Sequence, residues 1–144
     1  MAEPVVIGYG QNKWVKDANT KMVFLTTGGT AVSNTVTNLE TAAAGAATSS
    51  YTVPVGKKFV LLWLRPVVYS GSSKEGFFLY ESYGGVNYVK ARYGMNLANA
   101  NGNALWQGDM ETYMEFQAGS TISIVTFAAA MSMSIFCIGV ETDV

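Results

Sequence analysis

The sequence of 144 residues contains no histidine and a single cysteine. The absence of histidine excludes Ser-His-Asp and Cys-His nucleophile systems and every zinc or iron site that needs a histidine ligand. Cys137 has no partner for an internal disulfide. Its place in the apolar run SIFCI (residues 134–138) predicts a buried small hydrophobe rather than a reactive thiol. We therefore expect a protein that is not an enzyme and that holds no metal and no cofactor.

Charged residues are also scarce, at 13% of the chain, where about 25% is usual for a soluble domain. Nine basic and ten acidic residues give a formal charge of −1. No basic stripe is present, so we expect no nucleic-acid partner. A folded chain of this size exposes roughly 7,000 Å², which so few ions cannot cover at an ordinary density. Such a globule tends to self-associate, and this predicts a subunit that is buried against copies of itself or against a larger surface.

One uncharged stretch, residues 117–140, is long enough to span a bilayer as a helix. Its serines and threonines alternate with apolar residues at a period of two, and its flanks are acidic rather than basic. Both features favour strands over a membrane helix. The first residues also lack the pattern of a secretory signal, and we expect no membrane partner.

Runs rich in Val, Ile, Thr, Tyr and Phe, separated by Gly, Asn and Ser, predict about eight short strands. The fold class expected is all-β, an antiparallel two-sheet sandwich of jelly-roll or Greek-key type. The predicted domain covers residues 21–144, and residues 1–20 form an extended N-terminal arm. The predicted strands are residues 21–27, 31–39, 57–69, 77–81, 86–93, 109–116, 120–127 and 131–141. Segments 41–50 and 94–108 are predicted loops.

The apolar centre of the longest predicted strand, residues 59–64, predicts burial on both faces. Pro66 follows it and predicts a bend or an edge position. The predicted arm also carries apolar residues, Val5, Val6, Ile7 and Trp14. These form a candidate assembly arm, which either covers an edge of its own domain or extends onto a neighbour by adding a strand or filling a pocket.

Asp109, Glu111 and Glu115 have even spacing and share one predicted strand face with Tyr113. Paired carboxylates a few ångströms apart can hydrolyse glycosides. The same alternation is typical of any half-exposed strand. We therefore expect a solvated or interfacial face rather than a catalytic pair.

Aromatic residues crowd the middle third of the chain. Tyrosine and tryptophan combine a large apolar area with a polar tip, which suits protein interfaces and sugar binding. Tyr88 and Phe78 are predicted to belong to the core, on the pattern of their neighbours. The candidate exposed interface or glycan platform consists of Tyr83, Tyr93, Trp106 and Tyr113.

Two segments, VPVGKKFVLLWL (53–64) and FQAGSTISIV (116–125), share one local sequence pattern. In both, a predicted glycine turn reverses the chain before an apolar strand. With these corners, its small size and its Ser/Thr/Asn/Gly-rich strands, the chain resembles the β-sandwich virion structural proteins of tailed bacteriophages. The groups concerned are capsid decoration (cement) proteins and small tail or fibre subunits. The resemblance covers residues 21–144 and carries no functional residue across.

The resemblance implies a jelly-roll knob that forms a homo-oligomer, a trimer, on the major capsid protein or another virion protein. It implies location in the virion, assembled in the host cytoplasm. The alternative is a carbohydrate-binding or fibre-tip receptor-binding β-sandwich module, whose partner would be a glycan.

Overall fold

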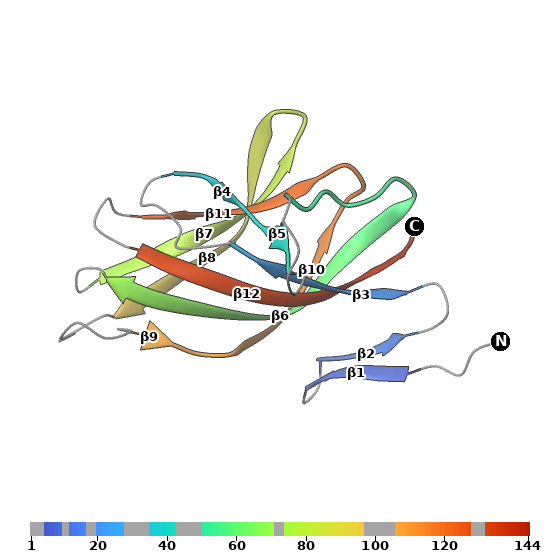
Figure 1. Ribbon diagram of the computed structural model, residues 1–144, viewed down its shortest axis with the longest axis horizontal. Helices are drawn as coiled ribbons and strands as arrows, with labels where there is room; N and C mark the ends of the chain where they lie inside the picture. The colour runs from blue at the N-terminus through green and yellow to red at the C-terminus, as the bar shows by residue number, and fades with distance from the viewer. Residues whose placement is uncertain are drawn as a thin grey trace.

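The computed structural model describes residues 5–9, 12–16, 20–27, 35–42, 50–70, 74–96, 106–127 and 132–144. These residues form twelve strands in three sheets, every strand pair is antiparallel, and none of the described residues is helical (Figure 1). The predicted fold class, an all-β antiparallel sandwich of two sheets, is confirmed. The jelly-roll connectivity stays a prediction.

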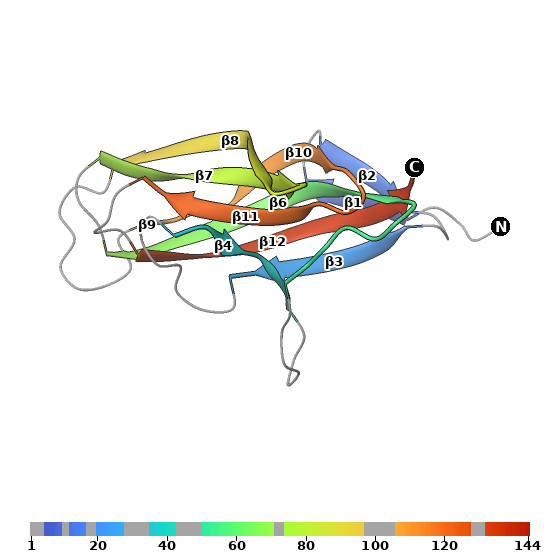
Figure 2. The same cartoon turned by 90° about the horizontal axis from the view of Figure 1, so that it is seen from above.

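Two sheets form the layers of the sandwich (Figure 2). In the large sheet the order is β10 (Met110–Phe116), β6 (Lys57–Ser70), β12 (Ser132–Asp143), β3 (Lys21–Thr26) and β5 (Glu40–Thr41), and β9 (Trp106–Gln107) also pairs with β6. In the small sheet the order is β4 (Thr37–Asn38), β11 (Thr121–Thr126), β7 (Lys74–Tyr83) and β8 (Val86–Asn96). The long strands β6 and β12 are neighbours, as are β7 and β8.

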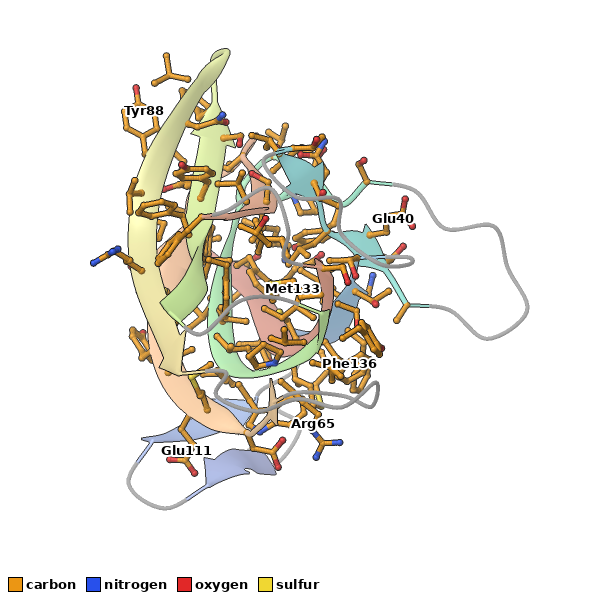
Figure 3. All side chains as sticks on the ribbon, turned by 90° about the vertical axis from the view of Figure 1, so that its left-hand side faces the viewer. Glu40, Arg65, Tyr88, Glu111, Met133 and Phe136 are labelled. Atoms are coloured by element: carbon orange, nitrogen blue, oxygen red, sulfur yellow. The ribbon has the colours of Figure 1, made fainter. Side chains whose placement is uncertain are left out.

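The main core lies between these two sheets, because alternate residues of each strand point inward. Met133 of β12 points between the layers in Figure 3 and is fully buried. Cys137 lies on the same side of β12, is buried as predicted, and its burial raises the pKa of the thiol. The largest fully buried side chains are Phe59, Phe77, Phe116, Leu25, Leu39, Leu61, Leu64, Leu79, Ile122, Ile124 and Met133.

The apolar centre of β6 is buried on both faces, as predicted. Phe59, Leu61 and Leu64 belong to the main core, whereas Val60 and Leu62 form a separate buried cluster on the outer side of the large sheet. That second cluster also contains Val140 and, partly buried, Met22. We call these four residues the outer cluster.

A β-bulge interrupts the pairing of β6 with β12. Ile138 pairs with Trp63 and the next residue, Gly139, pairs with Leu61, so Leu62 is the extra residue. The bulge shifts the alternation of β6 by one position. As a result Trp63 faces outward on the same side as Leu62.

Pro66 lies inside β6, opposite Ile135 of β12. On the other side of β6, the pairing with β10 ends at Leu64 and the pairing with β9 begins at Val67. At Pro66, β6 therefore has no backbone pairing with a neighbouring strand on that side. This is an edge position, where a proline without an N–H donor is tolerated.

The predicted N-terminal arm contains a hairpin of β1 (Val5–Tyr9) and β2 (Asn12–Lys16). In this two-stranded sheet Ile7 pairs with Trp14 and Val6 with Val15. β2 approaches β10, and the hairpin lies beside the large sheet in Figure 1. The side chains of Val5, Val6, Ile7 and Trp14 lie outside the described residues, and both alternatives for the assembly arm stay predictions.

The hairpin predicted around residues 82–85 is longer than expected. β7 and β8 continue to a tight turn at Gly84 and Gly85, whose φ angles of 58° and 80° fit a two-residue turn that matches the strand twist. The loop predicted at residues 94–108 is corrected in part, because residues 94–96 continue β8 and residues 106–107 form β9. Of the predicted strand 31–39, residues 37–38 form β4, and residues 31–34 lie outside the described residues, as do 43–49 and 97–105.

Candidate functional site: two aromatic sheet faces

The outer side of the large sheet carries apolar side chains from three adjacent strands. The register places Phe24, Ile138 and Trp63 side by side on β3, β12 and β6. The Phe136 ring lies 6.2 Å from the Phe24 ring and 6.0 Å from the Trp63 ring. Phe24 is 41% exposed and Phe136 36%. A phenylalanine that remains this exposed marks a surface that the chain itself does not cover.

Three charged side chains border these apolar residues. Glu111 of β10 pairs with Trp63 in the register, and Arg65 and Asp109 lie beside them. Figure 3 shows Arg65, Phe136 and Glu111 on the outer side of the large sheet, with Glu111 toward the N-terminal hairpin. We call the following set the large-sheet face: Phe24, Trp63, Arg65, Asp109, Glu111, Phe136 and Ile138.

Arg65 is already engaged within this face. Its guanidinium donates from Nε to Oδ1 of Asp109 at 2.5 Å and from Nη2 to Oδ2 at 3.0 Å, and it lies 5.3 Å above the Trp63 ring. The hydrogen bond from Arg65 holds the pKa of Asp109 below its ordinary value. Glu111, in contrast, is exposed and makes no ion pair with any side chain that the structure describes. Among its described side chains, the large-sheet face therefore carries one uncompensated negative charge.

The outer side of the small sheet has a second aromatic cluster. Phe78 and Tyr80 of β7 are stacked with their centroids 5.9 Å apart, and Phe127 lies 4.7 Å from Phe78. Arg92 of β8 pairs with Phe78 in the register, and its guanidinium lies 4.7 Å from the centroid of the Phe127 ring. We call the following set the small-sheet face: Phe78, Tyr80, Val89, Arg92, Val125 and Phe127.

Arg92 is exposed, and the described residues give it no carboxylate partner. The other members of the small-sheet face are half-buried, except Val89, which is 57% exposed. This face thus carries one uncompensated positive charge among its described side chains. The two outer faces of the sandwich are both aromatic and opposite in sign.

A polar groove of about 610 Å³ opens at one end of the sandwich, between Lys58, Glu81, Lys90 and Glu115. Glu81 is buried and accepts hydrogen bonds from the backbone N–H of Gln117 (2.7 Å), and its other polar contacts are to Ser120 Oγ (2.7 Å) and Lys90 Nζ (3.3 Å). Burial opposes the ionisation of Glu81, but these bonds outweigh it and hold its pKa below the ordinary value.

The other carboxylate of the groove is also paired, since Lys58 Nζ donates to Glu115 Oε1 at 2.7 Å. The hydrogen bond from Lys58 holds the pKa of Glu115 below its ordinary value. Each carboxylate of the groove is paired with a lysine. The Lys58–Glu115 pair links β6 to β10, and the Lys90–Glu81 pair links β8 to β7. This arrangement supplies no free acid and base pair for proton transfer.

The carboxylates on and next to β10 are exposed, as predicted. Asp109, Glu111, Tyr113 and Glu115 are all exposed, and their intervening neighbours in β10 are half-buried. The Tyr113 hydroxyl donates to Glu115 at 3.1 Å. Their common face is solvated, as the alternation indicates; Asp109 and Glu115 are ion-paired, and Glu111 has no ion pair among the described side chains.

The three predicted platform aromatics whose side chains the structure describes, Tyr83, Tyr93 and Tyr113, do not come together. Tyr83 is 46% exposed at the end of the β7–β8 hairpin, and Tyr113 is 53% exposed on β10 of the other sheet. The side chain of Trp106 lies outside the described residues. The prediction for Tyr93 is corrected: it is half-buried, stacks on Phe77 at 4.9 Å and packs on the main core.

Tyr88 was predicted to belong to the core and is 51% exposed. A bulge in the β7–β8 pairing, where Leu79 pairs with Ala91 and Tyr80 with Val89, places Tyr93 and Tyr88 on the same, core-facing side of β8. The exposure of Tyr88 comes from its place along the strand. Tyr88 lies near the projecting end of the hairpin, away from the large sheet (Figure 3).

Sequence reasoning placed Asp109 and Glu111 on an exposed face but missed Phe24, Trp63 and Phe136. It assigned Phe78 to the core, whereas Phe78 is half-buried on the outer side of the small sheet. Trp63 sits in a continuous apolar run that carries no alternation, and only the bulge turns it outward. Phe78 and Tyr80 do alternate with buried residues, and that signal was available in the sequence.

The fold and these faces define an antiparallel β-sandwich with an aromatic surface on each layer. Comparison with protein families and with curated proteins finds no match for this chain. The described residues contain no group of three or more His, Cys, Asp or Glu placed to hold a metal ion. In the same part of the chain, no helix is long and apolar enough to cross a membrane.

Proposed function

We propose that this chain is a non-enzymatic virion structural protein, a capsid decoration or cement subunit that binds and stabilises a capsid surface as a homo-oligomer. The observation that carries the proposal is the pair of aromatic outer faces, with Phe24 and Phe136 exposed on one and Phe78, Tyr80 and Phe127 half-buried on the other. Contiguous apolar surface bordered by polar groups is typical of protein–protein interaction sites.

The distribution of charge supports a structural role. Four ion pairs, Lys57–Asp143, Lys58–Glu115, Arg65–Asp109 and Lys90–Glu81, each join two neighbouring segments of a sheet. Exposed pairs of this kind contribute little to stability one by one. Their effect is to neutralise most of the described charges at the surface, which leaves apolar contacts to govern association.

The virion location, the trimer and the partner rest on the resemblance to tailed-bacteriophage β-sandwich proteins. On this proposal the partner is the major capsid protein or another virion protein, and the assembly takes place in the host cytoplasm. The sandwich would present one face to a neighbouring subunit and leave other surface for the capsid.

The first test is the native mass of the full chain, measured by light scattering and sedimentation over a wide concentration range. We expect a multiple of 15.4 kDa. The double variant Phe24→Ser/Phe136→Ser should lower the mass toward the monomer without loss of the cooperative melt. Val55→Ser is the matched control, because Val55 is 94% exposed and lies outside both faces. A wild-type chain that stays monomeric at high concentration contradicts the proposal.

A second candidate function, carbohydrate binding, is favoured by one observation. Trp63, Arg65, Asp109, Glu111 and Ile138 line a shallow pocket of about 460 Å³ that combines an indole ring with carboxylates. A glycan array probed with the wild type and with Trp63→Ala tests it. A sugar signal that Trp63→Ala abolishes supports this function, and the absence of any signal contradicts it.

A further inference from the structure

The two outer faces carry unpaired charges of opposite sign. Glu111 is the unpaired charge of the large-sheet face, because Arg65 and Asp109 neutralise each other. Arg92 is the unpaired charge of the small-sheet face, where the described side chains include no carboxylate. The faces belong to different layers and look away from each other (Figure 2). One subunit can therefore engage two neighbours at the same time.

A contact between two identical faces would leave these charges uncompensated. Two large-sheet faces would bring together two Glu111 carboxylates and no free cation, since Arg65 is held by Asp109. Two small-sheet faces would bring together two Arg92 guanidinium groups and no described carboxylate. A charge that is desolvated in an interface without a partner weakens binding. Only the contact between unlike faces pairs both charges.

Pairing through a free sheet edge, such as that of β8, is another route to self-association. β8 is an edge strand of the small sheet, next to β7 alone. Its pairing is interrupted between Val89 and Ala91, which leaves Lys90 as the bulged residue. A bulge and a lysine on an edge strand are devices that block strand addition. The aromatic faces are therefore the better candidates for the contact.

We infer that the large-sheet face of one copy binds the small-sheet face of a second copy, with Glu111 of the first opposite Arg92 of the second. This inference rests on the proposed self-assembly and specifies its geometry. The contact is head-to-tail, so each subunit uses both faces and the assembly grows beyond a two-fold dimer. The aromatic rings of both faces supply the apolar centre of the interface, and the ion pair sets its direction.

The test uses two charge reversals, Glu111→Arg and Arg92→Glu, measured by sedimentation velocity at an ionic strength of about 10 mM, where screening is weakest. In each single variant, the unpaired charges of the two faces have the same sign. Each should raise the dissociation constant of self-association by roughly tenfold or more, because like charges then face each other. Both side chains are exposed, so the thermal melt should not change.

An equimolar mixture of the two single variants should associate again. In the mixture, every contact between a large-sheet face of one variant and a small-sheet face of the other brings opposite charges together. The double variant Glu111→Arg/Arg92→Glu should also recover association by itself. Val55→Arg and Val55→Glu are the matched controls, since they change charge at a position that is 94% exposed outside both faces.

A mixture that stays as weak as its components overturns the head-to-tail contact. So does a pair of single variants that associate like the wild type; in that case the proposed self-assembly stands and only its geometry fails. A wild-type chain that is monomeric under all conditions refutes the proposed self-assembly itself. The same set of samples therefore separates the two failures.

Discussion

The hydroxyl of Tyr51 donates a 3.0 Å hydrogen bond to Oε1 of Glu141 inside the sandwich. Tyr51 is 6% exposed and Glu141 8%. The pair links the segment that precedes β6 to the end of β12. Burial, followed by the charge of Glu141, raises the pKa of Tyr51 well above its ordinary value.

Tyr51→Phe should therefore lower the free energy of unfolding by about 1–3 kcal/mol, because a buried carboxylate loses its hydrogen-bond donor. Glu141→Gln should cost less, because the amide oxygen still accepts from Tyr51. Urea unfolding of both variants and the wild type measures the difference. A Tyr51→Phe variant as stable as the wild type would show that water replaces the hydroxyl.

Gly139→Ala should be among the most destabilising single substitutions. An added Cβ would overlap the ring of Phe59 and the carbonyl oxygen of Val60, next to the bulge at Leu62 of β6. Overpacking of this kind costs about 3 kcal/mol, and backbone movement at the bulge would add to it. Thermal unfolding measures the loss.

Gly94→Ala is the matched control. Gly94 also lies in a strand, and a Cβ there would meet nothing within 4 Å. The free energy of unfolding of this variant should equal that of the wild type or exceed it by about 0.5–1 kcal/mol, because alanine reduces the entropy of the unfolded chain. Equal losses at the two glycines would contradict the role given to the Phe59 ring.

The free energy of unfolding should decrease as the pH is lowered into the acid range, and the protonation of Glu81 is one cause. Its pKa in the folded state is below its ordinary value, so its contribution is fully present above the unfolded pKa of about 4.3. The contribution is lost as the pH falls through that value and then through the lower pKa of the folded state. Glu81→Gln should flatten this part of the profile of unfolding free energy against pH.

The control for this profile is Glu111→Gln, at an exposed carboxylate without a described ion pair. Its profile should run parallel to that of the wild type. Denaturant titrations between about pH 3 and pH 7 cover the range in which ordinary carboxyl groups titrate. If Glu81→Gln and the wild type have parallel profiles, the hydrogen bonds from Gln117 and Ser120 do not favour the ionised form.

Deletion of residues 1–16 should leave the sandwich folded. β1 and β2 pair only with each other among the described strands, so the ladders of the two main sheets stay complete. We expect a cooperative thermal melt, because the main core lies between the two sheets that remain. Loss of the cooperative melt would instead make the hairpin part of the core.

Much of the fold could be predicted from local patterns. The alternation of β10, the glycine turn of the β7–β8 hairpin and the double burial of the β6 centre all depend on residues close in sequence. Two predictions failed for different reasons. A bulge places Tyr93 on the core-facing side of β8. Tyr88 is on that side too, but it lies near the end of the hairpin, away from the large sheet, and is exposed (Figure 3).

The sequence by itself determined that this protein is built from strands, that it has no histidine chemistry and that it has few ions to cover its surface. Only the tertiary structure decided which aromatic residues face outward. Phe24, Trp63 and Phe136 come from distant parts of the chain and meet because β3, β12 and β6 are neighbours. A strand has two equivalent sides, and the choice between them depends on pairing partners and bulges that no local pattern encodes.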